Sequence, residues 1–151
     1  MTKTDTARQL NQAKSAHLQW VQRAYMLMFG FEFEKDSVPI DSTQCVFGKW
    51  LYGECQALCH INDPIKDLIA DIERLHLQLH NSYFEIFKIY FGEQKKGFLR
   101  GLFKAKKKSL NEDEVKIANE HYRNLENISE HLIKKLTSLQ KKIHNTRRTN
   151  R

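Results

Sequence analysis

Apolar side chains recur at steps of three and four residues between Ile65 and Tyr90, and this spacing admits few folds. It is the spacing of a helix that buries one face. Asp63 and Pro64 precede the stripe and predict a helix start, with Asp63 as N-cap and Pro64 at the first position. Gly92 predicts its end. The stripe comprises Ile65, Ile69, Ile72, His76, His80, Tyr83, Phe87 and Tyr90.

Two further segments show the same period. The first runs from about Asp5 to Gly30 and the last from about residue 111 to 145. With only 2 Pro and 6 Gly in 151 residues, long helices are seldom interrupted. We therefore predict an all-α fold, an antiparallel four-helix bundle with a long C-terminal helix, that forms one domain over residues 1–151.

A shorter second helix is predicted after the loop at residues 31–40. Asp41 and Gln44 have the spacing of a capping box, with Asp41 as N-cap. Cys45 would then lie in the first helical turn, and the helix would continue to Cys59.

The last helix carries an apolar seam of four heptads, which at ~1.5 Å per residue belongs to a helix on the order of 50 Å long. A bundle of this size should not need so long a seam, so we expect a homodimer with part of the seam at its interface. The seam comprises Val115, Ala118, Tyr122, Leu125, Ser129, Leu132, Leu136, Leu139 and Ile143.

The net charge of +7 is unevenly distributed: residues 1–92 carry −2 and residues 93–151 carry +9. Residues 93–110 form a basic connector. Its segment 95–108 mixes lysines with Phe98, Leu99, Leu102 and Phe103, a composition that contacts membranes in some proteins. Two glycines weaken a helix there, so we favour a solvated connector and expect no nucleic-acid binding. With no export signal at the N-terminus, a cytoplasmic location and reduced cysteines are expected.

Three histidines lie on the apolar stripes of two helices. His76 and His80 are one turn apart and point to the same side of their helix, and His17 lies on the first stripe. Buried neutral imidazoles need partners. With Cys45 at the start of the second helix they make three imidazoles and one thiolate, a set suited to tetrahedral Zn²⁺.

The sequence resembles the chemoreceptor zinc-binding (CZB) domain family. The resemblance depends on His17 with Trp20, on the segment 45–51 (CVFGKWL), and on His76 with His80. It implies a helical bundle, often homodimeric, that binds zinc through His17, Cys45, His76 and His80. Phe47, Gly48 and Trp50 match family positions that serve packing.

The resemblance also implies a role in signal transduction. Family members commonly adjoin a chemoreceptor signalling region or a diguanylate cyclase, and these 151 residues contain neither. We therefore expect a stand-alone zinc or oxidant sensor, not an enzyme, that acts on such a signalling partner in trans. Cys45 is the predicted switch, because thiolate is the ligand that oxidants attack and a helix N-terminus favours the anion.

Three alternatives remain open at this point. One is a purely structural zinc domain, in which the zinc serves folding alone. Glu73 and His76 have the Glu-x-x-His spacing of di-iron or oxygen-binding bundles, although only one copy is present.

Cys55, Cys59 and His60 suggest a second metal site, but a fourth ligand is missing, so we expect Cys55 and Cys59 to be packed thiols. We expect His121, His131 and His144 to be solvated, and a hydrolytic zinc site is disfavoured because four ligands leave no position for water.

Overall fold

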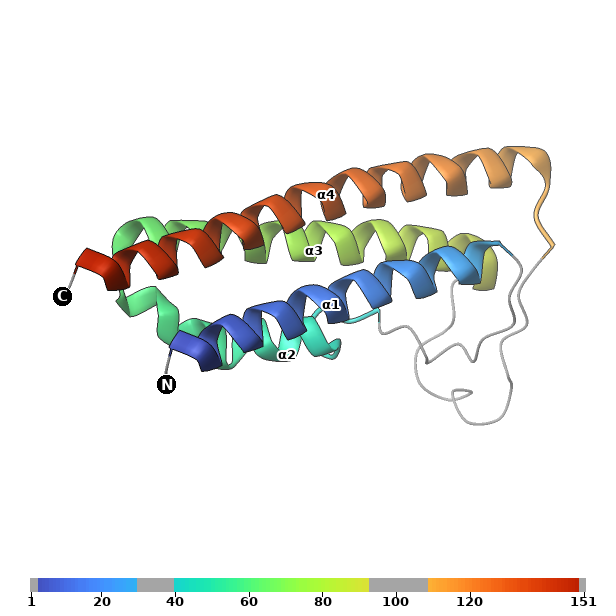
Figure 1. The fold of residues 1–151 in the computed structure, drawn as a ribbon. Helices are drawn as coiled ribbons and strands as arrows, with labels where there is room; N and C mark the ends of the chain where they lie inside the picture. The colour runs from blue at the N-terminus through green and yellow to red at the C-terminus, as the bar shows by residue number, and fades with distance from the viewer. Residues whose placement is uncertain (1–2, 30–39, 93–108, 150–151) are drawn as a thin grey trace.

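The computed structural model describes residues 3–29, 40–92 and 109–149, and the described residues are helical throughout except for short connections. Helix α1 spans Lys3–Met28, α2 spans Val46–Tyr52, α3 spans Asp63–Phe91 and α4 spans Glu112–Thr149. A 3₁₀ helix, η2, spans Glu54–His60 between α2 and α3. Figure 1 shows the three long helices side by side, with α2 packed beside α1.

The helices alternate in direction, as predicted for an antiparallel bundle. On α3 and α4, Asp71 contacts Lys135 and Ser82 contacts Asn124, so these two helices run in opposite directions. On α1 and α4, Lys14 contacts Thr137 while His17 contacts Ser129, which gives the same relationship. The predicted all-α fold is confirmed.

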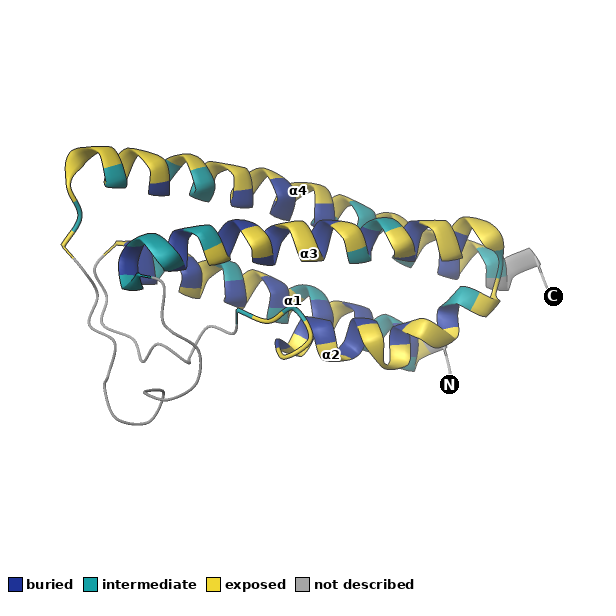
Figure 2. Cartoon of the chain, turned by 180° about the vertical axis from the view of Figure 1, so that it is seen from behind, coloured by how far each residue is buried: buried dark blue, intermediate teal, exposed yellow. Residues whose placement is uncertain are grey.

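The predicted apolar stripes form the core. Every residue of the α3 stripe is buried, from Ile65 at 0 % exposure to Tyr90 at 8 %. On α1, Leu10, Ala13 and Trp20 are buried as well. Figure 2 shows the buried residues of each long helix turned toward its neighbours and the exposed residues turned outward.

The seam of α4 faces the core of its own chain. Ala118, Leu125, Leu132 and Leu139 are each 0 % exposed, whereas Val115 at the start of the helix is 41 % exposed. The chain covers more of this seam than expected, because α3 is itself 29 residues long and packs along α4. The predicted homodimer, with part of the seam at its interface, stays a prediction.

Three helix boundaries differ from the predictions. Asp41 caps no helix: its carboxylate accepts hydrogen bonds from the backbone N–H and hydroxyl of Thr43 in a turn, and α2 begins at Val46. Asn62 and not Asp63 is the N-cap of α3, where its side chain accepts the N–H of Ile65. The second helix does not continue to Cys59, because α2 ends at Tyr52 and the chain continues as η2 after Gly53.

The outer helices end within a few residues of their predicted limits. Helix α1 ends at Met28, and α4 extends to Thr149, beyond the predicted residue 145. The predicted loop at residues 31–40, except Ile40, and the basic segment 95–108 lie outside the described residues. No helix in the described ranges is long and apolar enough to cross a membrane.

Candidate metal centre

Cys45 is held in place by the start of α2. It is the N-cap, in extended conformation, and its Sγ accepts the backbone N–H of Gly48 at 3.2 Å. A thiol takes here the capping role that Ser or Asp usually fills. This cap orients the sulfur into the bundle, where Cys45 is only 5 % exposed.

Gly48 lets this turn close. A Cβ at this position would lie 1.8 Å from the carbonyl oxygen of Ser42 and 3.3 Å from Sγ of Cys45. Only a residue without a side chain permits so close an approach of the two backbone segments. The glycine of the CVFGKWL segment therefore has a steric role beside the sulfur.

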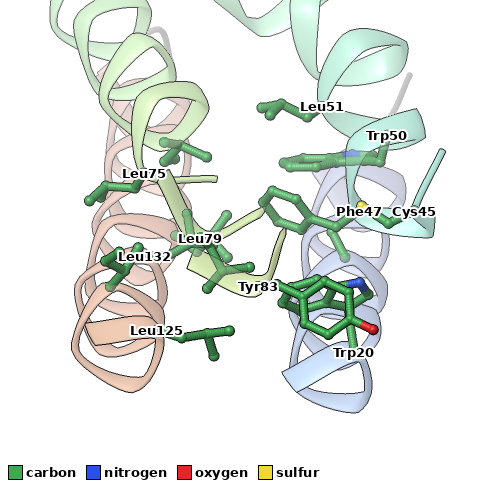
Figure 3. Close-up of a cluster of buried hydrophobic side chains, with 14 of the residues drawn as sticks. Trp20, Cys45, Phe47, Trp50, Leu51, Leu75, Leu79, Tyr83, Leu125 and Leu132 are labelled. Carbon is green, nitrogen blue, oxygen red and sulfur yellow. The ribbon is translucent and has the colours of Figure 1, made fainter. Parts of the chain in front are cut away.

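Phe47 and Trp50 anchor α2 in the core. Phe47 is 2 % exposed and points from α2 toward α3 (Figure 3). Its ring lies 4.8 Å from that of His76 and 5.8 Å from that of His17. The ring of Trp50 packs on Phe47 at 5.6 Å. These contacts agree with the packing role that the family resemblance implies for both residues.

His76 and His80 come from consecutive turns of α3 and are almost fully buried, at 0 % and 3 % exposure. Their ring centroids are 4.6 Å apart, and Trp20 stacks on His80 at 4.5 Å. Nε2 of His76 lies 3.3 Å from Sγ of Cys45. Cys45, His76 and His80 each offer a ligand atom, and these atoms lie within 4.8 Å of one another.

This spacing suits zinc. A tetrahedral centre with ordinary Zn–S and Zn–N bonds would hold a sulfur and a nitrogen about 3.5 Å apart. Nε2 of His80 is buried and has no hydrogen-bond partner, while Nδ1 of the same ring donates to the carbonyl oxygen of Ile40 at 2.7 Å. A histidine ligand typically has this arrangement, with one nitrogen donating to an oxygen and the other free for the metal.

His17 is buried at 1 % exposure but stands apart from the other three. Its Nε2 lies 2.9 Å from Oγ of Ser129 on α4. Nevertheless all four predicted ligands line one cavity of about 150 Å³, together with side chains of α1 and with the exposed Val46. The structure thus places His17 at the same cavity as Cys45, His76 and His80, but not within the group of close ligand atoms that those three residues form.

Burial keeps the three imidazoles neutral. Burial, with a smaller contribution from the neighbouring His80, lowers the pKa of His17 to about 4 and that of His76 to about 3. The pKa of His80 is lowered by burial as well, although the Ile40 carbonyl and Asp41 oppose this. Neutral imidazoles keep the lone pair that a metal needs.

Two opposing effects act on the pKa of the Cys45 thiol. Burial raises its pKa above the ordinary value, and the backbone N–H groups at the start of α2 only partly offset this. These N–H groups favour the thiolate, as predicted, but without a metal ion desolvation outweighs their hydrogen bonds. Binding of a metal ion would supply the missing positive charge and remove the proton.

The other candidate groups have the environments expected of packed or solvated side chains. Cys55 is fully buried and Cys59 half-buried. Burial and the nearby Cys59 raise the pKa of Cys55 to about 12. His131 and His144 are exposed and His121 is partly so. Among the described residues, the group of His, Cys, Asp and Glu side chains close enough to hold a metal ion is Cys45, His76 and His80.

Two contacts were missed at the sequence level. The Ile40 carbonyl that holds His80 is a backbone group, so no residue type marks it. Ser129 could have been recognised from the sequence, because its hydroxyl interrupts the apolar seam of α4; in the structure it is 6 % exposed. A polar residue in such a stripe indicates a buried partner, which the structure identifies as His17.

Comparison with known proteins adds one match. Residues 17–87, a little under half of the chain, match the family model of the chemoreceptor zinc-binding domain. The matched segment begins at His17 and contains Cys45, His76 and His80. No curated protein and no solved structure matched the chain.

Proposed function

We propose that this chain binds one Zn²⁺ and uses it as a regulatory centre, since residues 17–87 match the family model of the chemoreceptor zinc-binding domain. His17, Cys45, His76 and His80 would be the ligands. The observation that carries the proposal is the buried group of Cys45, His76 and His80, in which Nε2 of His80 has no other partner. When bound, zinc would supply a positive charge that keeps the Cys45 sulfur as a thiolate.

The chain's own residues prepare the site before metal arrives. Gly48 donates its N–H to Sγ of Cys45, and Ile40 fixes the ring of His80. Trp20 and Phe47 cover the imidazoles and exclude water from them. Four protein ligands would complete a tetrahedron and leave no position for a water nucleophile, which argues for regulation and against hydrolysis.

A regulatory role is favoured over a purely structural one by the core that exists apart from the site. Helices α3 and α4 form the most extensive helix pair of the described residues, and the buried Leu125, Leu136 and Leu139 of α4 do not line the cavity of the predicted ligands. This core should hold the helices together without metal. Metal loss would then release α2 from α3 and alter a surface that a partner signalling protein, such as a diguanylate cyclase or a chemoreceptor, can read.

Zinc stoichiometry tests the ligand set. Elemental analysis of purified protein should give one zinc per chain for the wild type and for His131→Ala, an exposed histidine on α4. His76→Ala and His80→Ala should lose stoichiometric zinc. A full equivalent retained by either would refute the assignment.

Chelation separates the two roles. If the domain is regulatory, removing zinc should leave most of the helical circular dichroism in place while changing oligomeric state or binding to a partner. A chain that unfolds on chelation would instead be a structural zinc domain.

A further inference from the structure

The contact between His17 and Ser129 joins the metal site to a helix outside the family match. His17 is the first residue of the matched segment, and Ser129 lies 42 positions after its last residue. Both side chains are buried, at 1 % and 6 % exposure, and Nε2 and Oγ are 2.9 Å apart. A hydroxyl buried in an apolar seam is costly unless it is bonded, so this contact has a role that a leucine could not fill.

The position of the cavity indicates which ring nitrogen of His17 is available to a metal ion. His17 lines the cavity that the other three predicted ligands share, whereas Ser129 is not among its lining residues. Since Nε2 is engaged by Ser129, Nδ1 is the nitrogen left for the cavity side. His80 has the mirrored arrangement: Nδ1 donates to Ile40, and Nε2 is free.

We propose that Ser129 is the positioning residue for the fourth zinc ligand. Its hydroxyl accepts a hydrogen bond from Nε2–H of His17, which fixes the tautomer and turns Nδ1 to the metal. The inference depends on the proposed zinc function and deepens it, because the ligand on α1 is then oriented by α4. Metal loading is thereby linked to the packing of α4 against α1.

Histidine ligands whose outer hydrogen bond is removed typically bind metal 10–100-fold more weakly. Ser129→Ala should therefore still bind one zinc, with an affinity lower by about this factor in competition with a chromogenic chelator. Thr137→Ala is the matched control: Thr137 is also a hydroxyl on α4 that contacts α1, through Lys14, and it lies away from the metal ligands. It should bind zinc as the wild type does. Equal affinities for the two variants would overturn the proposal.

A second measurement uses the wild type and so does not depend on how a variant folds. In ¹⁵N-labelled protein loaded with ¹¹³Cd²⁺, one-bond coupling to the metal should appear at Nδ1 of His17 and at Nε2 of His80. Coupling at Nε2 of His17 would mean that the ring leaves Ser129 on binding, and no coupling at His17 would mean a three-residue site; either result overturns the role of Ser129. In both cases His76 and His80 would still bind the metal, whereas failure of the zinc function itself would show as a wild type that takes up neither zinc nor cadmium.

Discussion

Sγ of Cys45 lies 3.3 Å from Nε2 of His76, although the two residues are 31 positions apart in the chain. A thiol and a neutral imidazole at this separation gain little from each other beyond one weak hydrogen bond. With His80 they form a compact group of donors, and His17 lines the same cavity.

Gly48→Ala should disrupt the site without touching a ligand. The added Cβ would lie 1.8 Å from the carbonyl oxygen of Ser42, so the backbone that places Cys45 must shift. We expect a loss of stability of about 1–3 kcal/mol, typical of overpacking, together with weakened zinc binding. Urea unfolding and a chelator competition assay measure the two effects.

The control for this variant is Lys49→Ala, an exposed residue of the same short helix. It should change neither quantity by much, because surface substitutions are usually within about 0.5 kcal/mol. Wild-type zinc affinity in Gly48→Ala would show that the tight turn is not needed to place the sulfur.

Acid should destabilise the metal-free protein already at pH values well above the pKa values of its buried histidines. In the folded chain the pKa of His17 is about 4 and that of His76 about 3, against 6.5 for an unperturbed histidine. Below pH 6.5 the unfolded chain therefore takes up protons that the folded chain does not. Stability is fully present above pH 6.5 and is lost progressively as the pH falls toward 4.

At pH 5 the loss relative to pH 7 should be about 2 kcal/mol for each of these two histidines. Urea unfolding in the presence of EDTA at a series of pH values measures it. His76→Gln should show a shallower dependence than the wild type. A free energy of unfolding that is flat between pH 7 and pH 5 would contradict the burial of neutral imidazoles.

Oxidant should release zinc by attacking Cys45 before the other cysteines. Bound zinc would keep this sulfur as a thiolate, and the exposed Val46 lines the cavity beside it. Cys55 is fully buried, and its pKa of about 12 keeps it protonated. Peroxide should convert the Cys45 thiolate to a sulfenic acid, which removes one ligand.

A chromogenic chelator follows the released zinc while mass spectrometry identifies the modified cysteine. Double replacement of Cys55 and Cys59 by Ala should leave zinc release unchanged, which makes that variant the matched control. If Cys55 and Cys59 are oxidised first and the zinc stays bound until they are consumed, Cys45 is only a structural ligand.

Leu132→Ala tests whether α4 belongs to the same cooperative unit as the metal site. Leu132 is 0 % exposed and lies among the side chains between α3 and α4 (Figure 3). Its truncation should cost about 2–5 kcal/mol of stability, as for other buried leucines. Glu130→Ala, an exposed neighbour on α4, should cost little. A small loss for Leu132→Ala would mean that α4 unfolds separately.

The sequence by itself determined the helical fold, and it singled out Cys45, His76 and His80, which the structure brings together. The periods of α1, α3 and α4 predicted which faces are buried, because one buried face of a helix imposes its repeat on the residues that line it. The one-turn spacing of His76 and His80 predicted two rings on one side of α3. Cys45 was recognised by its segment, although its place in the helix was assigned one turn too deep.

Only the tertiary structure decided what surrounds those donors. The cap at Asn62, the turn at Asp41 and the break at Gly53 depend on local competition among neighbouring side chains, which periodicity does not resolve. The contacts of His80 with the Ile40 carbonyl and of His17 with Ser129 join positions 40 and 112 residues apart. Burial raises the pKa of the Cys45 thiol, although the N–H groups at the start of α2 lower it. The sequence could not predict this result, because desolvation depends on how many neighbours surround a group in the folded chain.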